Sequence, residues 1–411
     1  MIRIAFIKFG GLAAGGTEKV LQTIALNLPK DKYQVTYFYT ESAPYVGSDF
    51  KHMGTDPVVK ALLEKNNINL IKVNVTAKDI TVPTHDWVDS NFFDVFNEKD
   101  FDLIQTGRSG QPEYPFYKIK TTPIVDSIHI IGGVDNQFNI ARVMHISEWS
   151  ARKWIRMGGD PSRSRVIYYP VKIPSYAHID YRKELALQDK FIFGFHQRND
   201  PHIFSPTPLE AYSRIETDRT HFLLLTGSQR HKDQAKRLGI KNITFLPHTS
   251  NLDGLYSFLE TLDVYTHGRR DGELNSQAIA EAMSFGVPIV SHLSLINNGH
   301  VETIGDAGVV TATTRDYVYW LRRIMSDPDI RERFSENAKL RFRNNYDLDT
   351  QMKKIEALYE DVLRNPFPDT LQRKKLDAQN NHQRKSIFKR AYLYGCRYVE
   401  LAELFLKAHL R

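Results

Sequence analysis

Short apolar segments and amphipathic stretches alternate along most of the chain. Ile2–Lys8 and Tyr33–Tyr39 have the length and residue types of buried strands, and Thr17–Leu28 between them has helical spacing. Similar segments predict further strands near Asn69–Val73, Asp102–Gln105, Pro123–Ser127, Val143–Ile146 and Arg165–Tyr168. A second series predicts strands at Phe191–Phe195, His221–Leu225, Ile243–Phe245, Val264–Thr266, Pro288–Ser291 and Gly308–Val310, then helices near Tyr317–Met325, Ile330–Asn345 and Thr350–Leu363. Strands that alternate with helices indicate two parallel sheets, each covered by helices.

The break between the two series predicts the domain boundaries. Residues 1–172 form a first α/β domain, and 173–190 form a mixed, polar linker with a short helix. Residues 191–365 form a second α/β domain, and 366–411 form a basic helical tail. Ligands of such folds bind at the carboxyl ends of the strands, so a cleft between two such domains is the expected site.

Composition indicates an ordinary soluble protein. The chain has 411 residues, of which 41% are hydrophobic and 25% are charged. Cys396 is the single cysteine, which excludes an internal disulfide framework and fits a reducing compartment. Because no apolar run approaches about 20 residues and the first strand does not resemble a signal peptide, we expect a cytoplasmic protein.

The net charge of +7 is concentrated in the tail. Residues 371–411 contain ten Lys/Arg and three Asp/Glu, so the rest of the chain is neutral as a whole. This distribution argues against a nucleic-acid-binding face spread over the fold. Two interpretations of the tail stay open: a helix that packs on the body with a solvated cationic face, or an interfacial helix attracted to anionic lipid.

The segment Asp271–Ser291 is the most informative for chemistry. It predicts a helix over Gln277–Met283, with Asn275 or Ser276 as its N-cap and a stop at Gly286. Glu273 precedes this helix and Glu281 lies inside it. Carboxylates accept hydrogen bonds from sugar hydroxyls and a helix N-terminus binds phosphate, so the pair suits a nucleotide-sugar. Either glutamate alone would more often be a solvated surface charge.

Three other places carry candidate chemistry. A glycine-rich turn over residues 9–18 follows the first strand and opens the first helix, where anions bind, although it does not match G-x-G-x-x-G. His129 ends a predicted strand, while His145 lies within the next strand and suits a packed residue better. Arg198 ends the first strand of the second domain, and a guanidinium suits paired phosphates.

The motif EAMSFGVPIV, with Glu273 eight residues before Glu281, resembles the signature of the retaining, GT-B-fold glycosyltransferases of family 4 (glycosyl transferases group 1). This resemblance implies two Rossmann-like domains that face across a cleft. It implies that Glu273 contacts hydroxyls of the donor sugar and Glu281 the ribose. It also implies that Gly15 and Gly16 approach the donor phosphate and the acceptor pocket, and that His129 lies beside the reacting sugar. The diphosphate would be bound by Arg198, Leu274, Asn275, Ser276 and Gln277. The nucleobase would lie beside Gly227, Pro247 and His248.

The chain departs from that pattern at two positions. Most members carry Phe-Gly where this chain has Asn275-Ser276. The lysine expected after Arg198 is missing, since residues 199–208 contain no Lys or Arg. His202, Arg269 and Arg270 are the candidates for the second phosphate.

The resemblance implies a glycosyltransferase that moves a sugar from a nucleotide-diphosphate sugar to a hydroxyl of a glycan or lipid-linked acceptor, with retention. The pairs Asp327/Asp329 and Asp347/Asp349 are typical of caps and turns, and no metal and no cofactor is expected. Two alternatives stay open: a catalytically silent GT-B subunit that binds nucleotide-sugar or glycan, and an NAD(P)-dependent oxidoreductase.

Overall fold

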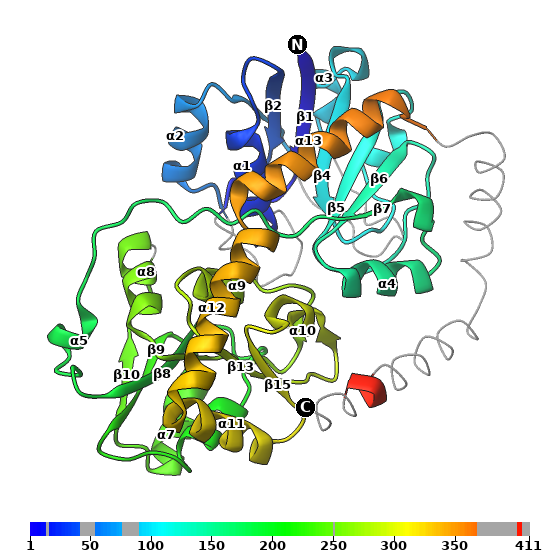
Figure 1. Cartoon of the computed structure of the whole chain (residues 1–411). Coiled ribbons are helices and arrows are strands. Elements are labelled where there is room, and N and C mark those ends of the chain that lie inside the picture. The colour runs from blue at the N-terminus through cyan, green and yellow to red at the C-terminus, as the bar shows by residue number, and fades with distance from the viewer. Residues whose placement is uncertain (14–15, 42–53, 76–89, 250, 368–400, 405–411) are drawn as a thin grey trace. The chain divides into compact units, whose positions relative to one another are not determined.

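The computed structural model describes residues 1–13, 16–41, 54–75, 90–249, 251–367 and 401–404. The chain divides into two compact units (Figure 1). Unit 1 comprises Met1–Pro170 and Asp349–Leu393, and unit 2 comprises Val171–Leu348 and Tyr394–Arg411. Each unit is described by itself.

Unit 1 is built on a seven-stranded parallel sheet in the order β3-β2-β1-β4-β5-β6-β7. Its strands are β1 (Ile2–Lys8), β2 (Tyr33–Tyr39), β3 (Asn69–Lys72), β4 (Leu103–Arg108), β5 (Ile124–Ile128), β6 (Ile140–His145) and β7 (Ser164–Val166). The central strands β4 and β5 are buried along their whole length, as expected for a sheet covered on both faces. The strand order reverses between β1 and β4, which is where open α/β sheets bind ligands.

The helices of unit 1 include one from the far end of the chain. They are α1 (Gly16–Asn27), α2 (Pro57–Lys65), α3 (Phe92–Val95), α4 (Glu148–Arg156) and α13 (Leu348–Arg364), with short 3-10 turns at Glu98–Asp100, Phe116–Lys118 and Pro161–Arg163. From Asp349 on, α13 belongs to unit 1, although this stretch lies within the segment 191–365 that was expected to form the second domain. Tyr359 on α13 donates a hydrogen bond to Gln105 Oε1 at 2.9 Å, and Arg142 pairs with Asp361 at 2.8 Å. These partners are over 200 residues away, so local sequence does not reveal them.

Unit 2 repeats the same topology in a six-stranded parallel sheet of order β10-β9-β8-β11-β13-β15. Its strands are β8 (Phe191–Gln197), β9 (Thr220–Thr226), β10 (Ile243–Leu246), β11 (Val264–Thr266), β13 (Ile289–His292) and β15 (Gly308–Thr311). Two short segments, β12 (Gly272–Glu273) and β14 (Asn297–Asn298), pair with each other outside this sheet. The order reverses between β8 and β11, so their carboxyl ends mark the expected binding edge.

Eight helices lie among the described residues of the Val171–Leu348 part of unit 2 (Figure 1). They are α5 (Tyr181–Glu184), α6 (Thr207–Tyr212), α7 (Gln229–Leu238), α8 (Leu252–Thr261), α9 (Gln277–Ser284), α10 (Gly299–Ile304), α11 (Thr314–Ser326) and α12 (Pro328–Asn345). The segment predicted as a linker contains α5 and is tied to unit 2, because Arg182 pairs with Asp263 at 2.9 Å.

The predicted α/β class with two parallel sheets is confirmed. Every strand predicted at a buried apolar run is present, and Ser276 is the N-cap of α9. The short elements α2, α3, β12 and β14 were not predicted. Most of the predicted basic tail lies outside the described residues, where only 401–404 are described, as helix. Among the described helices, none combines the length and the apolar character needed to cross a membrane.

Candidate functional site

Glu273 lies beyond the carboxyl end of β11 in a segment that glycine shapes. Gly272 has φ +63°, and a Cβ there would lie 1.8 Å from the Asn297 carbonyl oxygen, so only glycine fits. This close approach pairs β12 with β14 and fixes the backbone of Glu273. Glu273 Oε1 accepts hydrogen bonds from His267 Nε2 at 3.2 Å and Ser276 Oγ at 3.1 Å.

The Glu273 carboxylate stays charged although it is largely enclosed. Its side chain is 15% exposed, and Arg269 Nη1 lies 3.8 Å from Oε1. Burial alone would raise the pKa of this carboxyl, but the Arg269 charge and the His267 hydrogen bond outweigh it and lower the pKa to about 2. Glu273 therefore acts as a hydrogen-bond acceptor, not as an acid, at neutral pH.

The N-terminus of α9 follows directly and carries the second carboxylate. Ser276 caps the helix by accepting from the Ile279 amide, and Asn275 accepts from Thr303 Oγ1 at 3.3 Å. Glu281 is buried on α9, accepts from Gln277 Nε2 at 3.0 Å, and lies 3.8 Å from His196 Nε2 at the end of β8. Neither glutamate is a solvated surface charge, and both lie close to the start of the same helix.

The arginines near this helix differ in their availability. Arg198 is 69% exposed on its side chain and pairs with Asp200 at 3.0 Å. Arg269 is held by Asp271 through two hydrogen bonds of 3.0 and 2.7 Å, and it also faces Glu273. Arg270 is exposed and forms no ion pair with any described residue. Its amide donates to the Ile203 carbonyl at 3.1 Å, which places it against the loop that follows β8 and lacks the expected lysine.

The structure also brings together two predicted residues at the end of β9. Gly227 has φ +72°, and the preceding Thr226 has φ +71°, an uncommon conformation for a residue with a side chain. Thr226 Oγ1 lies 3.4 Å from His248 Nδ1, while the Gly227 amide donates to the Gln197 carbonyl at 3.0 Å. His248 and Pro247 are both exposed beyond β10. Gly227 and His248 thus lie beside the end of β8, on the same sheet edge as His196.

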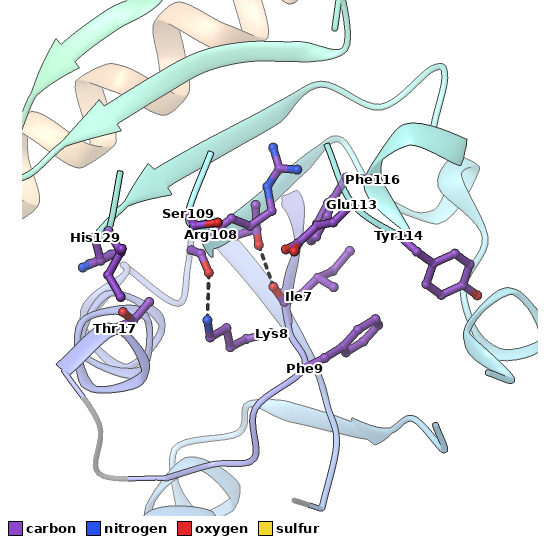
Figure 2. A pocket seen from close by; sticks show the side chains of 13 residues that line it. Ile7, Lys8, Phe9, Thr17, Arg108, Ser109, Glu113, Tyr114, Phe116 and His129 are labelled. Atoms are coloured by element: carbon purple, nitrogen blue, oxygen red, sulfur yellow. Dashed lines mark hydrogen bonds between the residues drawn. The ribbon is translucent and has the colours of Figure 1, made fainter. Parts of the chain in front are cut away.

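Unit 1 has a pocket of about 180 Å³ at its own switch point. The ends of β1 and β4 supply Lys8 and Arg108, and His129 follows β5 (Figure 2). Figure 2 shows Thr17 and His129 on one side of the pocket and Tyr114 and Phe116 on the other. Gly16 is exposed at the start of α1, while Gly15 lies outside the described residues.

His129 is a neutral residue in this pocket. Its ring stacks on Tyr169 at 5.6 Å, with Nδ1 3.4 Å from the Tyr169 hydroxyl. Burial, together with the Lys8 charge, lowers the pKa of His129 to about 3. Its Nε2 is buried without a partner among the described residues, so it is free to accept or donate one hydrogen bond. His145 is packed against Trp154 within β6, as its sequence pattern indicated.

A buried ion triad supports the loops around this pocket. Arg108 pairs with Asp126 at 2.9 Å and with Asp135 at 3.1 Å, and all three side chains are about 1% exposed. Arg108 also donates to the Gln111 carbonyl, and its guanidinium lies over the Phe116 ring at 4.6 Å. The Arg108 guanidinium therefore connects the end of β4 to the segments that contain Gln111 and Asp135 and to Asp126 on β5. Sequence reasoning did not single out Arg108, because its partners are 18 and 27 residues away.

Comparison with known proteins adds to this geometry. The family described as Glycosyl transferases group 1 matches residues 179–341. The matched residues lie within unit 2, so this unit is the part of the chain that is similar to that family. The match contains Arg198, Glu273 and Glu281, and no curated protein matches the chain.

Solved structures match almost the whole chain, and they show its fold to be GT-B, with two Rossmann-like domains. HepE of Anabaena in complex with UDP and glucose is 18% identical, with a TM-score of 0.66, and the match covers 88% of this chain and all of HepE. A glycosyltransferase from Rickettsia africae is 16% identical, with a TM-score of 0.70, over 89% of this chain and 99% of that one. Sucrose-phosphate synthase from Thermosynechococcus elongatus is 15% identical, with a TM-score of 0.65, over 89% of this chain and all of the enzyme.

Within the matched region, sequence reasoning missed two histidines that lie next to the carboxylates. His196 approaches Glu281, and His267 hydrogen-bonds Glu273. Both lie at or just beyond the carboxyl end of a strand, which is a signal that could have found them. Among the described residues, no group of three or more His, Cys, Asp or Glu side chains could hold a metal ion.

Proposed function

We propose that this chain is a glycosyltransferase that moves a sugar from a nucleotide-diphosphate sugar to an acceptor hydroxyl, with retention and without a metal ion. The single observation that carries the proposal is the arrangement around α9. Two carboxylates, Glu273 and Glu281, flank a helix N-terminus inside the region that is similar to the glycosyl transferases group 1 family. This set offers acceptors for hydroxyls and amide donors for phosphate.

The donor is held by unit 2 in this proposal. Glu281, enclosed near His196, accepts hydrogen bonds from the ribose hydroxyls. Glu273 accepts from hydroxyls of the sugar, and Leu274, Asn275, Ser276 and Gln277 present backbone amides to the diphosphate. HepE binds UDP and glucose on the same fold, which supports a nucleotide-sugar as donor. Gly227, Pro247 and His248 frame the nucleobase.

Two arginines supply positive charge to the diphosphate. Arg198 ends β8, and its only ion pair among described residues is the exposed contact with Asp200. Arg270 replaces the missing lysine, because it is exposed and anchored to the loop after β8. Arg269 does not suit this role, since its guanidinium already serves Asp271 and Glu273.

The acceptor binds in unit 1. The pocket at the end of β1 and β4 combines apolar walls with the polar groups of Lys8, Thr17 and His129. His129, neutral at physiological pH, offers a hydrogen bond to a sugar hydroxyl. Gly15 and Gly16 belong to the glycine-rich segment that approaches the donor phosphate and the acceptor in this proposal. In this proposal, the molecule that accepts the sugar is a glycan or a lipid-linked glycan.

Cleavage of the glycosyl–phosphate bond builds negative charge on the leaving diphosphate. Arg198, Arg270 and the amides of 275–277 stabilise that charge, and the leaving phosphate takes the proton of the acceptor hydroxyl. No protein nucleophile takes part, and the new bond forms on the face that the phosphate leaves. The protein acts in the cytoplasm, and its basic tail holds it at an anionic membrane surface.

The test is a donor screen. The purified chain is incubated with UDP-, GDP-, dTDP- and ADP-sugars, and nucleotide release is followed for wild type and Glu273→Ala, each with and without EDTA. We expect release with one donor class, insensitivity to EDTA, and loss in the variant. Nucleotide binding without release from any donor would indicate a silent subunit instead. The anomeric configuration of the product, read by NMR, decides retention.

A further inference from the structure

Both ring nitrogens of His267 form hydrogen bonds with side chains of other segments. Nε2 lies 3.2 Å from Glu273 Oε1, and Nδ1 lies 2.8 Å from Ser291 Oγ on β13. The backbone of His267 is fixed as well, because its amide donates to the Val290 carbonyl at 2.8 Å and the Tyr317 hydroxyl donates to its carbonyl at 3.1 Å. The ring is buried, so it has one position and two obligatory partners.

These partners determine which tautomer the neutral form of the ring adopts. The Glu273 carboxylate can only accept, so Nε2 must carry the hydrogen. Nδ1 is then the acceptor, and the buried Ser291 hydroxyl donates to it. A hydrogen on Nδ1 would instead place two lone pairs against each other at Nε2 and Oε1. Glu273 thus selects the Nε2–H tautomer, and the Ser291 hydroxyl stabilises that tautomer by donating to Nδ1.

Other ionisable groups around the cluster leave this assignment intact. The His300 ring faces His267 at 5.4 Å and is fully buried, and burial lowers the pKa of His300 to about 3. Burial also lowers the pKa of His292 to about 4. Arg269, which is held by Asp271, is therefore the permanent cation next to Glu273.

The two carboxylate oxygens of Glu273 differ in their hydrogen bonds. Oε1 receives His267 Nε2–H and Ser276 Oγ–H, which uses both of its lone-pair positions. Oε2 accepts no hydrogen bond from any described residue, and the side chain is 15% exposed. Oε1 is thus held by two hydrogen bonds, and Oε2 is available to accept a hydrogen bond from a ligand.

We infer that His267 is the positioning residue for Glu273, and that Ser291, by donating to Nδ1 of the Nε2–H tautomer, completes a three-residue relay that presents Oε2 to a hydroxyl group of the bound ligand. The identity of that ligand as a donor sugar rests on the proposed function. The relay itself rests on the geometry of β11, β12 and β13.

The first measurement needs no substrate. Histidine ¹⁵N-labelled full-length protein is examined by long-range ¹H–¹⁵N NMR, and the His267 signals are assigned by their loss in His267→Gln. We expect a hydrogen on Nε2 and an unprotonated Nδ1. Glu273→Gln is expected to shift the Nε2 signal and Ser291→Ala the Nδ1 signal. A hydrogen on Nδ1, or signals that neither substitution moves, would overturn the relay.

The second measurement compares two substitutions at the same position. Gln can place an N–H near the site of Nε2, whereas Asn reaches only the site of Nδ1. Loss of a hydrogen bond to a charged group costs about 10- to 100-fold, so we expect His267→Asn to lower kcat/KM for the donor by that factor. His267→Gln is expected to recover most of the activity. Equal loss in both variants would contradict a positioning role.

A matched control comes from an exposed histidine of the same unit. His178 Nδ1 contacts Glu260 at 2.9 Å on the surface, so His178→Gln removes a similar pair without touching the relay. It should leave kinetics and the His267 signals unchanged. Should wild type turn over no donor, the proposed function fails by that result, while the NMR measurement still decides the relay.

Discussion

The Ser276 hydroxyl joins Glu273 to the N-terminus of α9. It donates to Glu273 Oε1 at 3.1 Å and accepts from the Ile279 amide at 3.3 Å. The same atom therefore caps the helix and orients the carboxylate. One side chain therefore sets the positions of two binding groups: the amides at the start of α9, which suit a ligand phosphate, and the Glu273 carboxylate, which suits a ligand hydroxyl.

Ser276→Ala should therefore weaken stability and activity together. Loss of an N-cap costs about 1 kcal/mol, which lowers Tm, and Glu273 loses one of its two donors. We expect kcat/KM for the donor to fall by about 10-fold, as for one lost hydrogen bond to a charge. Ser276→Thr keeps the hydroxyl, so it should retain most of the stability and most of the activity of wild type. Thermal unfolding measures the first and donor kinetics the second.

The matched control is Thr313→Ala in the same unit. Thr313 caps α11 by accepting from the Asp316 amide at 3.2 Å and is exposed, away from Glu273. It should lower Tm to a similar extent and leave kcat/KM unchanged. If Thr313→Ala costs as much activity as Ser276→Ala, the effect of Ser276 is one of stability alone.

Glu281→Gln should remove recognition of the ribose. The substitution keeps the shape of the buried side chain and its contact with Gln277, but it replaces a charged acceptor by a neutral amide. We expect wild type to bind the ribonucleotide about 10- to 100-fold more tightly than its 2′-deoxy form, and the variant to lose that preference. Calorimetric titration with both nucleotides measures this. An unchanged preference would show that Glu281 does not contact the ribose.

Arg270→Ala should weaken the hold on the diphosphate. Arg270 is exposed and has no ion pair with the described residues, so its removal leaves no partner unpaired. We expect affinity for the nucleoside diphosphate to fall about 10-fold, and affinity for the monophosphate to change less. Arg237→Ala on the surface of α7 removes an exposed arginine elsewhere and is the control. Equal losses for both nucleotides would argue against Arg270 as the missing cation.

His145 should make unit 1 sensitive to acid. Burial lowers its pKa to about 3, below the ordinary value near 6.5 that it has when unfolded. Between these values the unfolded chain binds a proton that the folded chain does not, so stability is complete above pH 6.5 and is lost as the pH falls toward 3. His145→Phe keeps a ring against Trp154 and removes this cost, which amounts to about 2 kcal/mol at pH 5. Its gain in Tm should be larger at pH 5 than at pH 8, and the exposed His178→Phe serves as the control for histidine loss.

The tail is expected to bind anionic membranes through its positive charge. Arg384, Lys385, Lys389 and Arg390 are part of the basic excess of residues 371–411, which lies almost wholly outside the described residues. Replacing these four by Gln in the full chain should reduce co-sedimentation with vesicles that contain phosphatidylserine, and added salt should do the same. Neutral phosphatidylcholine vesicles are the control. Equal sedimentation of both proteins would support a tail that packs on the body.

Local sequence determined the periodic part of this protein. Apolar runs of strand length set β1, β2 and β11 to the residue, and the short polar side chain of Ser276 set the start of α9, because strand burial and helix capping depend on neighbours within a few residues. The positions of Glu273 and Glu281 relative to that helix follow from the same local rules.

Only the tertiary structure decided which side chains share a site. His267 reaches Ser291 across the sheet, Arg108 meets Asp126 and Asp135 in the interior, and α13 packs on unit 1 from the far end of the chain. These contacts join residues that are distant in sequence, and they are fixed by strand order and burial, which no local pattern encodes. The sequence therefore identified the two carboxylates, and the fold supplied the partners that orient one and enclose the other.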